Sequence, residues 1–491
     1  MDHHPMSTTS HTPTQENAAL QDGRSALDLV LGRVRLLARR RVMWLREIWR
    51  EAGQESEGRL NFHGMVDTIL AERDQVELER AWQVSHPDLQ ELNAQLAEIE
   101  QSLAEMQQTR LTYLCWRFGL SREEIDLLHA CLALALDPEL ERVFSYLQDH
   151  NARGYVTLAL VRKLFGYRHN LSPISFHNLK TWRFIVTRPN VANEPTRFDL
   201  DEWVVSWLMG MDNLDPVLLG KADFPEAKAP LANWPTEEGI GWLRKVWDRN
   251  AQQKLRLLIE GMPGSGRKTM AATIARENGF PLMVVNLGEL TGDAWEMTYV
   301  HAQRQAFLNG FAVGWTHEDI GELNWPVDVL PVPLQFIFME QDLAIHPGDR
   351  VVDMKLTIPP LSIPERKTLW EALVPASKLW VPQTFEAIVQ RYKTTIGQIA
   401  AVRAKAADTP EEAIEVLRSG TRYRLGKLAQ RLPATFTWED LTLPPFLEES
   451  LQDLVFEAKE REIWWENAAA KRLFPQGKGL LALFTGPPGT G

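Results

Sequence analysis

The sequence predicts a mixed fold, with an all-α region in the first part of the chain and a parallel α/β sheet in the second. Within residues 241–375, five short apolar runs alternate with helical patterns, which favours a parallel sheet with helices on both faces. The predicted strands are residues 255–260, 282–287, 311–315, 334–339 and 354–358. Earlier in the chain, apolar residues recur at helical spacing over residues 24–52 and 87–118. Two glycine-rich turns, each after an apolar run, add a candidate function to this fold class.

Changes in composition divide the chain into successive segments. Residues 1–22 are polar and are predicted to be disordered. The predicted segments that follow are a helical region at 23–118, a wing-containing domain at 119–220, a proline-containing linker at 221–240, the α/β core at 241–375, a helical lid at 376–432, a linker and helix at 433–478, and the truncated start of a second α/β core at 479–491.

The composition indicates a globular protein without a membrane span. Of the 491 residues, 44% are hydrophobic and 24% are charged, and the formal net charge is −12. This acidic balance argues against non-specific binding of nucleic acid. Cys115 and Cys131 lie in apolar helical patterns, so we expect reduced core residues in a cytoplasmic protein. The 12 histidines show no metal-ligand spacing, and no apolar stretch is long enough to cross a bilayer.

The first glycine-rich turn has the context of a phosphate-binding loop but altered key residues. Such a loop points main-chain N–H groups at phosphates, while a Lys reaches the β- and γ-phosphates and a Ser or Thr hydroxyl holds Mg²⁺. Here the Lys position holds Arg267 and the hydroxyl position holds Lys268, so Thr269 reaches a metal only if the loop carries one extra residue. We therefore predict weak ATP binding and little or no hydrolysis. The candidate ligands are Gly261, Gly264, Ser265, Gly266, Arg267, Lys268 and Thr269, with Thr269 as the metal ligand.

The second glycine-rich turn is the end of the chain. Apolar residues at 480–484 precede Gly486, Pro487, Pro488, Gly489, Thr490 and Gly491, which match the first part of a phosphate-binding loop. The Lys and hydroxyl positions fall beyond residue 491, so we do not expect this incomplete loop to function in nucleotide binding as it stands. A glycine-proline turn after a buried strand is the alternative interpretation. We also expect the unpaired apolar strand to make this chain less soluble than one that ends near residue 432.

Acidic residues follow the third predicted strand. Glu318 and Asp319 are the candidate catalytic pair, one to organise Mg²⁺ and one to polarise the attacking water. They do not follow the strand directly, because Thr316 and His317 come first. A solvated loop is the commoner interpretation of such a segment. The next strand, residues 334–339, is followed by Glu340 and Gln341 where a small polar sensor is expected, and an acid there would repel a γ-phosphate.

These motifs together resemble a AAA+ ATPase with two tandem modules, the first of them degenerate. Residues 346–373 are similar to the stretch where the last core strand passes into the helical lid, and residues 394–407 to a lid helix with a second sensor arginine. By that resemblance Arg403 is the candidate sensor, although a surface arginine on an amphipathic helix is an equal alternative. Arg350 is the nearest match to an inter-subunit arginine finger. The resemblance implies ATP and Mg²⁺ as cofactors and a homo-oligomeric ring.

A closer resemblance, over residues 110–491, is to bacterial AAA-family ATP-binding proteins with a helical, winged-helix-like N-terminal region. The stretches at 120–128, 136–149 and 435–444 carry it. Such proteins are often encoded with contractile injection systems, which implies protein partners and ATP hydrolysis by an intact second module that remodels or assembles a complex. The alternatives are a non-catalytic scaffold or ring partner and, more weakly, a DNA-binding initiator-type AAA+ protein.

Two further patterns bear on partners. Residues 182–187 and 198–200 look like strands of a small wing, and the nearest helix carries only Arg162 and Lys163, with Arg168 beyond it. These basic residues are too few for a DNA surface, so we favour protein contact. The helix at 24–52 carries Arg33, Arg35, Arg39, Arg40, Arg41, Arg46 and Arg50. A solvated face is the commoner explanation, and docking on an acidic partner or a membrane surface is the alternative.

Overall fold

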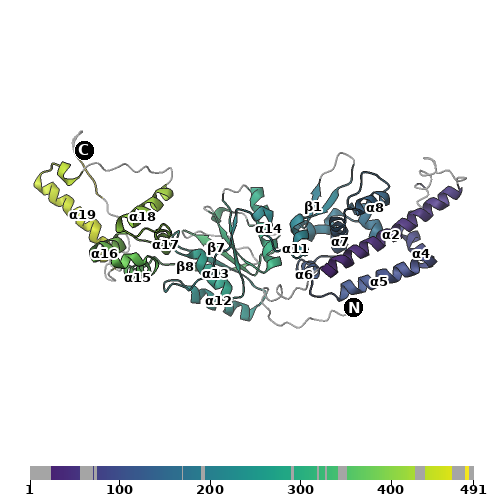
Figure 1. The fold of residues 1–491 in the computed structure, drawn as a ribbon, viewed down its shortest axis with the longest axis horizontal. Helices are drawn as coiled ribbons and strands as arrows, with labels where there is room; N and C mark the ends of the chain where they lie inside the picture. Colours follow the sequence, from purple (N-terminus) through teal and green to yellow (C-terminus); the bar gives the residue numbers. More distant parts are fainter. Residues whose placement is uncertain are drawn as a thin grey trace.

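The computed structural model describes residues 24–55, 70, 74–168, 170–188, 194–288, 292–317, 320–323, 325–326, 329–340, 351–425, 437–466 and 482–485. Figure 1 shows an elongated molecule with three parts in a row: a helical N-terminal region, a central sheet, and a helical lid followed by a long helix. The mixed fold predicted from the sequence is confirmed. The predicted disordered tail lies outside the described residues.

The N-terminal region is built on the long helix α2 (Arg24–Glu55). Val30, Val34 and Leu37 follow one another at helical spacing, and all three are buried. Around α2 lie α4 (Val76–Ser85), α5 (Gln90–Glu105), α6 (Arg110–Arg117), α7 (Arg122–Leu136), α8 (Leu140–Leu147), α9 (Leu158–Phe165), α10 (His177–Thr181) and α11 (Glu202–Leu208), with short 3₁₀ turns η1 (Pro87–Leu89), η2 (Pro173–Phe176) and η3 (Pro216–Leu218). The predicted helix at 87–118 is thus two helices with a break between them.

The predicted wing is present as a two-stranded antiparallel sheet. Strand β1 (Ile185–Arg188) pairs with β2 (Arg197–Leu200), with Ile185 opposite Leu200. Cys131 is buried beneath β2, where its thiol donates to the Phe198 carbonyl at 3.5 Å. Neither Cys131 nor Cys115 forms a disulfide. The hairpin therefore packs on α7 as part of the N-terminal core rather than projecting from it.

The arginine-rich face of α2 is divided between surface and interior. Arg35, Arg39, Arg46 and Arg50 are exposed, as the expectation of a solvated face has it, whereas that expectation is wrong for Arg33 and Arg41, which are buried. Arg33 bonds Asp126 at 2.6 Å and Glu100 at 3.1 Å, and Arg41 pairs with Asp74 and Glu79. The side chains of Arg35, Arg40 and Arg50 bond Asp137, Asn93 and Glu47 respectively. Glu100, Asp126 and Glu79 belong to neighbouring helices, so the two buried arginines, Arg33 and Arg41, help to hold the helical region together.

The central sheet has six strands in the order β3-β5-β6-β7-β4-β8. Their bounds are β3 (Ala222–Asp223), β4 (Lys254–Glu260), β5 (Leu282–Asn286), β6 (Ala312–Thr316), β7 (Leu334–Met339) and β8 (Val351–Thr357). All pair in parallel except the edge strand β3, which is antiparallel to β5. The five predicted strands are confirmed to within a few residues. β3 and the start of the following helix lie in the segment predicted as a linker, because two residues are too few to give a periodic signal.

Alternate residues of the strands face two separate cores. Phe336 and Phe338 of β7 face helices α12 (Thr236–Arg249) and α13 (Arg267–Glu277), whereas Ile337 and Met339 face α14 (Gly292–Asn309) and the N-terminal region. The short turn η4 (Ile320–Glu322) adds Ile320 to this second core. The sheet is thus buried on both faces, as apolar parallel strands require. One continuous hydrophobic core joins the N-terminal region to the sheet.

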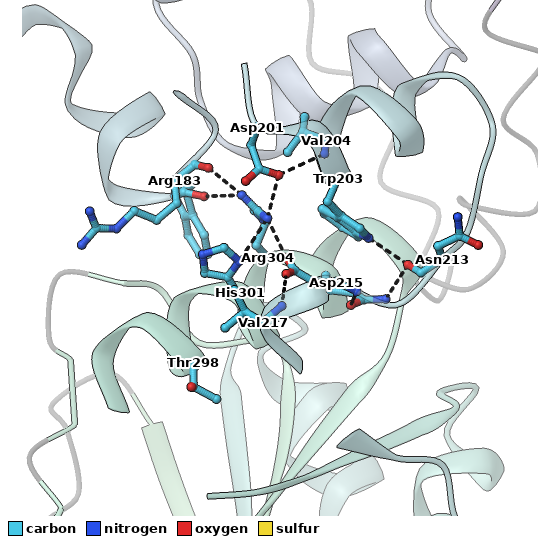
Figure 2. A network of polar contacts seen from close by, with 12 residues as sticks. Arg183, Asp201, Trp203, Val204, Asn213, Asp215, Val217, Thr298, His301 and Arg304 are labelled. Carbon is cyan, nitrogen blue, oxygen red and sulfur yellow. Dashed lines mark hydrogen bonds and ion pairs between the residues drawn. The ribbon is translucent and has the colours of Figure 1, made fainter. Parts of the chain in front are cut away.

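A buried polar network strengthens this junction (Figure 2). Arg304 of α14 is 0% exposed and bonds Asp215 at 2.6 Å and Asp201 at 3.2 Å, while its other nitrogen donates to the Arg183 carbonyl. His301, one turn earlier, lies 2.8 Å from Asp215. Burial alone would raise the pKa of Asp215, but the His301 hydrogen bond and the Arg304 charge lower it to about 2. The N-terminal region and α14 therefore share one set of buried charges.

The lid consists of α15 (Ile363–Leu373), α16 (Pro382–Arg391), α17 (Ile396–Ala404) and α18 (Pro410–Leu425), with the 3₁₀ turn η5 (Pro375–Leu379), around its own apolar cluster. Turn η6 (Trp438–Asp440) and helix α19 (Pro445–Glu466) follow. The described residues 482–485 form no strand, and Leu483 is 87% exposed, so the predicted second apolar strand is wrong for these residues. A strand needs a neighbour for its main-chain hydrogen bonds, and none of the described strands lies beside this segment. No helix among the described residues is long and apolar enough to span a bilayer.

Candidate functional site

The first glycine-rich loop lies where the sequence places it, between β4 and α13 at the carboxyl ends of the parallel strands. Gly264 and Gly266 have φ of +82° and +96°, a backbone region that glycine enters without strain. Gly266 is the N-cap of α13, so the first turn of that helix points its N–H groups toward the loop. The local backbone is thus that of a phosphate-binding loop.

A tryptophan from the preceding segment is packed against this loop. A Cβ atom built on Gly266 would lie 2.2 Å from the indole of Trp234. The indole nitrogen donates to the Ser265 carbonyl at 3.1 Å, and Trp234 is only 7% exposed. The absence of a side chain at Gly266 therefore serves the approach of an aromatic ring.

The lid is in direct contact with the same loop. The Gly397 nitrogen donates to the Gly264 carbonyl oxygen at 2.8 Å. A Cβ on Gly264 would meet the Thr395 hydroxyl at 2.7 Å, and one on Gly397 would meet the Gly264 Cα at 2.9 Å. Thr395 caps α17 by accepting from the Gln398 nitrogen, with Gln398 returning the contact. The capped start of a lid helix thus rests on the loop glycine without space between them.

Arg267, which occupies the lysine position, is bound to the end of strand β7. Its guanidinium donates to the Met339 carbonyl and lies 3.7 Å from a Glu340 carboxylate oxygen. The loop also bonds β7 through the Gly261 nitrogen, 3.1 Å from the same Met339 carbonyl. The acid predicted to repel a γ-phosphate is therefore a partner of the residue predicted to attract one.

The remaining predicted site residues differ in where they lie. Thr269 lies in the first turn of α13, where its carbonyl accepts from the Thr273 hydroxyl at 3.0 Å. Arg403 is exposed near the far end of α17, about 12 Å along the helix axis from Thr395. Glu318, Asp319, Arg350 and residues 486–491 lie outside the described residues. Within the part of the chain that is described, no three His, Cys, Asp or Glu side chains form a group that could hold a metal ion.

The space left beside the loop is small. A cavity of about 80 Å³ lies between the loop, residues 231–233 and the lid. Sites for drug-sized ligands and cofactors span roughly 300–1,000 Å³. This cavity is too small for a nucleoside triphosphate, and the lid and Trp234 lie against two glycines of the loop.

Trp234, Thr395 and Gly397 are site residues that no motif in the sequence predicted. The pattern from Thr395 to Gln398 is a capping-box signature and predicts a helix start, but no pattern in the sequence says that this start meets the loop. Trp234 lies in the predicted linker, where an aromatic residue has no periodic partner. These contacts depend on tertiary structure alone.

The basic residues near the wing are also engaged within the chain. Lys163 pairs with Asp74, and Arg168 lies 3.5 Å from Glu77. Arg80 of α4 donates to the Gly166 carbonyl at 2.7 Å, just past α9. Asp74, which precedes α4, and Glu77 of α4 therefore place acidic side chains against the basic end of α9.

Comparison with known proteins bears on part of the chain. Residues 9–169, about a third of the sequence, match the family described as "Winged helix domain, variant". This match ends before the hairpin β1–β2 and begins well before residue 119, where the sequence placed the winged-helix-like part. No curated protein matches the chain.

One similar solved structure is a proline-to-glycine mutant of Thermotoga maritima RuvB. It shares 13% identity, covers 40% of this chain and 73% of that chain, and has a TM-score of 0.30. A similarity at this level supports no conclusion about function. The AAA+ resemblance therefore depends on the motifs and on the order of strand, loop and helix.

Proposed function

We propose that residues 222–425 form a AAA+-like module that does not bind or hydrolyse nucleotide, and that the chain serves as a scaffold or ring partner in a protein assembly. The observation that carries the proposal is the hydrogen bond from the Gly397 nitrogen to the Gly264 carbonyl, which fastens the lid to the loop. In this contact the main chain of the lid lies directly against the main chain of the loop.

Three positions of the phosphate-binding motif have internal partners that support this proposal. Trp234 covers Gly266, the start of α17 covers Gly264, and Met339 with Glu340 receives the Arg267 guanidinium. A planar guanidinium bound to a carbonyl and a carboxylate cannot act as the mobile point charge that a lysine provides. The loop then acts as a joint between core and lid.

ATP hydrolysis belongs, in this proposal, to a second module, and Gly486–Gly491 match the first part of its phosphate-binding loop. The resemblance to tandem AAA+ proteins suggests a ring in which the first module contributes contacts and the second contributes turnover. The link to contractile injection systems is part of the same proposal and rests on resemblance alone. DNA binding is less favoured, because Lys163 and Arg168 already pair with Asp74 and Glu77.

Titration of this chain with Mg²⁺-ATP, followed by calorimetry and by phosphate release, tests the proposal. We expect neither binding in the micromolar range nor turnover. Trp234→Ala should open one side of the loop, and Trp247→Ala, a half-buried tryptophan on α12 away from the loop, is the matched control. Micromolar ATP binding by the unaltered chain would contradict the proposal.

A further inference from the structure

A cleft of about 450 Å³ lies where the N-terminal region meets the central sheet. Its walls come from the end of α7, the first turn of α8, the hairpin β1–β2, the start of α11, η3 and α14. This volume is within the range of ligand-binding sites, roughly 300–1,000 Å³. The cleft shares no lining residue with the small cavity at the glycine-rich loop, so it is a separate feature of the molecule.

The imidazole of His301 brings an unused hydrogen-bond acceptor to this cleft. His301 lines the cleft and is only 7% exposed, with its Nδ1 2.8 Å from Asp215 (Figure 2). The Asp215 carboxylate also accepts from Arg304 at 2.6 Å and from the Val217 nitrogen at 3.0 Å. An ionised carboxylate only accepts, so we assign the ring proton to Nδ1, which leaves Nε2 as an acceptor. The hydrogen bonds that His301 makes with the described residues use Nδ1 and not Nε2.

The charged side chains of the lining are acidic in balance. Its carboxylates are those of Glu141, Asp199, Asp201, Glu202 and Asp215, and its guanidiniums are those of Arg188 and Arg197. Asp199 pairs with both arginines, at 2.8 Å and 3.3 Å. Arg304, which does not line the cleft, pairs with Asp201 and Asp215. Five carboxylates against three guanidiniums leave two negative charges in excess.

The excess charges are those of Glu141 and Glu202. Both residues are exposed, and neither forms an ion pair with another described residue. The whole chain carries a formal net charge of −12, which adds a long-range attraction for basic partners. The charge of the cleft therefore favours a cationic guest.

The rest of the lining includes an aliphatic wall. Its members are Leu134, Ala135, Pro138, Val186, Pro216 and Val217. A lysine side chain has an apolar stem that packs on such a surface while its charged end stays near water and polar groups. Its ammonium group donates three hydrogen bonds and accepts none, which matches a lone acceptor nitrogen among carboxylates.

We propose that this cleft binds a lysine side chain from a basic segment of a protein partner. The ammonium group donates to Nε2 of His301 and is attracted by Glu141 and Glu202, while the stem packs on the aliphatic wall. Because the walls come from the N-terminal region and from α14, the guest contacts both sides of their junction. The inference goes beyond the proposed function and holds whether or not the glycine-rich loop binds ATP.

The test is a calorimetric titration of the whole chain with a short peptide of alternating glycine and lysine, acetylated and amidated at its ends. The matched peptide carries norleucine in place of lysine, which keeps the stem and removes the ammonium group. We expect the norleucine peptide to bind at least about tenfold more weakly, because it lacks the hydrogen bond from a charged donor. Added salt should weaken binding of the lysine peptide only.

Two variants of the chain address the two parts of the site. His301→Asn keeps an N–H group for Asp215 but has no atom at the Nε2 position, and it should weaken lysine-peptide binding by about tenfold. The double change Glu141→Gln with Glu202→Gln removes the two unpaired carboxylates and should weaken it by about fivefold, as expected for exposed charges.

The control is the double change Glu237→Gln with Glu238→Gln, two exposed acids in the first turn of α12, which should leave binding unchanged. Equal affinity for the two peptides would overturn the inference, as would equal lysine-peptide affinity in the Glu141 and Glu202 double variant and in its control. If His301→Asn fails to fold, these two comparisons still decide. None of these outcomes bears on the proposed function, which the ATP titration tests separately.

Discussion

The main-chain nitrogen of Gly397 lies 2.8 Å from the carbonyl oxygen of Gly264, so a glycine of the lid is hydrogen-bonded to a glycine of the loop. Neither position tolerates a side chain, because a Cβ on either one meets the other segment within 3 Å. Two glycines far apart in the sequence thus serve one close contact. This relationship makes the core–lid joint accessible to experiment.

Gly397→Ala should loosen the lid. The new methyl group would lie 2.9 Å from the Gly264 Cα and 3.0 Å from its carbonyl oxygen, so the two backbones must move apart. Overpacking of this kind costs about 1–3 kcal/mol. Hydrogen exchange over residues 261–266 and 394–399 should become faster while α14 stays protected. Gly241→Ala is the control, since nothing lies within 4 Å of its Cβ position, and unchanged exchange in Gly397→Ala would show that the contact is not tight.

Restoring the motif should not restore the site. The double change Arg267→Lys with Lys268→Thr recreates the usual phosphate-binding sequence, yet Trp234 and the Gly397 contact remain in place. We therefore expect no binding of a fluorescent ATP analogue by anisotropy, and weak binding only when Trp234→Ala is added. Tight binding by the double variant alone would mean that the two altered residues, rather than the closed lid, exclude nucleotide.

Arg304→Met should destabilise the junction of the N-terminal region with the sheet. The change removes a buried cation and leaves the Asp215 carboxylate without its 2.6 Å partner. Breaking such a buried pair costs about 3–5 kcal/mol, measured as a lower urea midpoint. Arg183→Gln is the comparison, because that side chain is 55% exposed and lies 3.9 Å from Glu296, an arrangement worth about 0–1 kcal/mol. Equal midpoints for the two variants would exclude a stabilising role for the network.

Mild acid should destabilise the N-terminal helical region through His129. Burial, with the nearby charge of Arg33, lowers the pKa of His129 to about 3, below the 6.5 of an exposed imidazole. Below pH 6.5 His129 becomes protonated in the unfolded chain but stays neutral in the folded chain. The free energy of unfolding therefore falls by about 1.4 kcal/mol per pH unit toward pH 3. His129→Gln should flatten this slope between pH 6.5 and 4.5, whereas His177→Gln, at an exposed position, should leave it unchanged. The same slope in all three proteins would contradict this assignment.

Local patterns in the sequence were sufficient to predict the fold class, five of the six strands of the central sheet, and the strand–loop–helix order at Gly261–Thr269. These features are set by periodicity and glycine spacing within a few residues, because apolar faces must be buried and left-handed turns need glycine. The partners of the loop could not be predicted in this way. Trp234, Met339 and Gly397 come from three distant segments, and only packing brings them to the loop. A motif in the sequence identifies a backbone shape, whereas the tertiary structure decides what fills the space that the shape encloses.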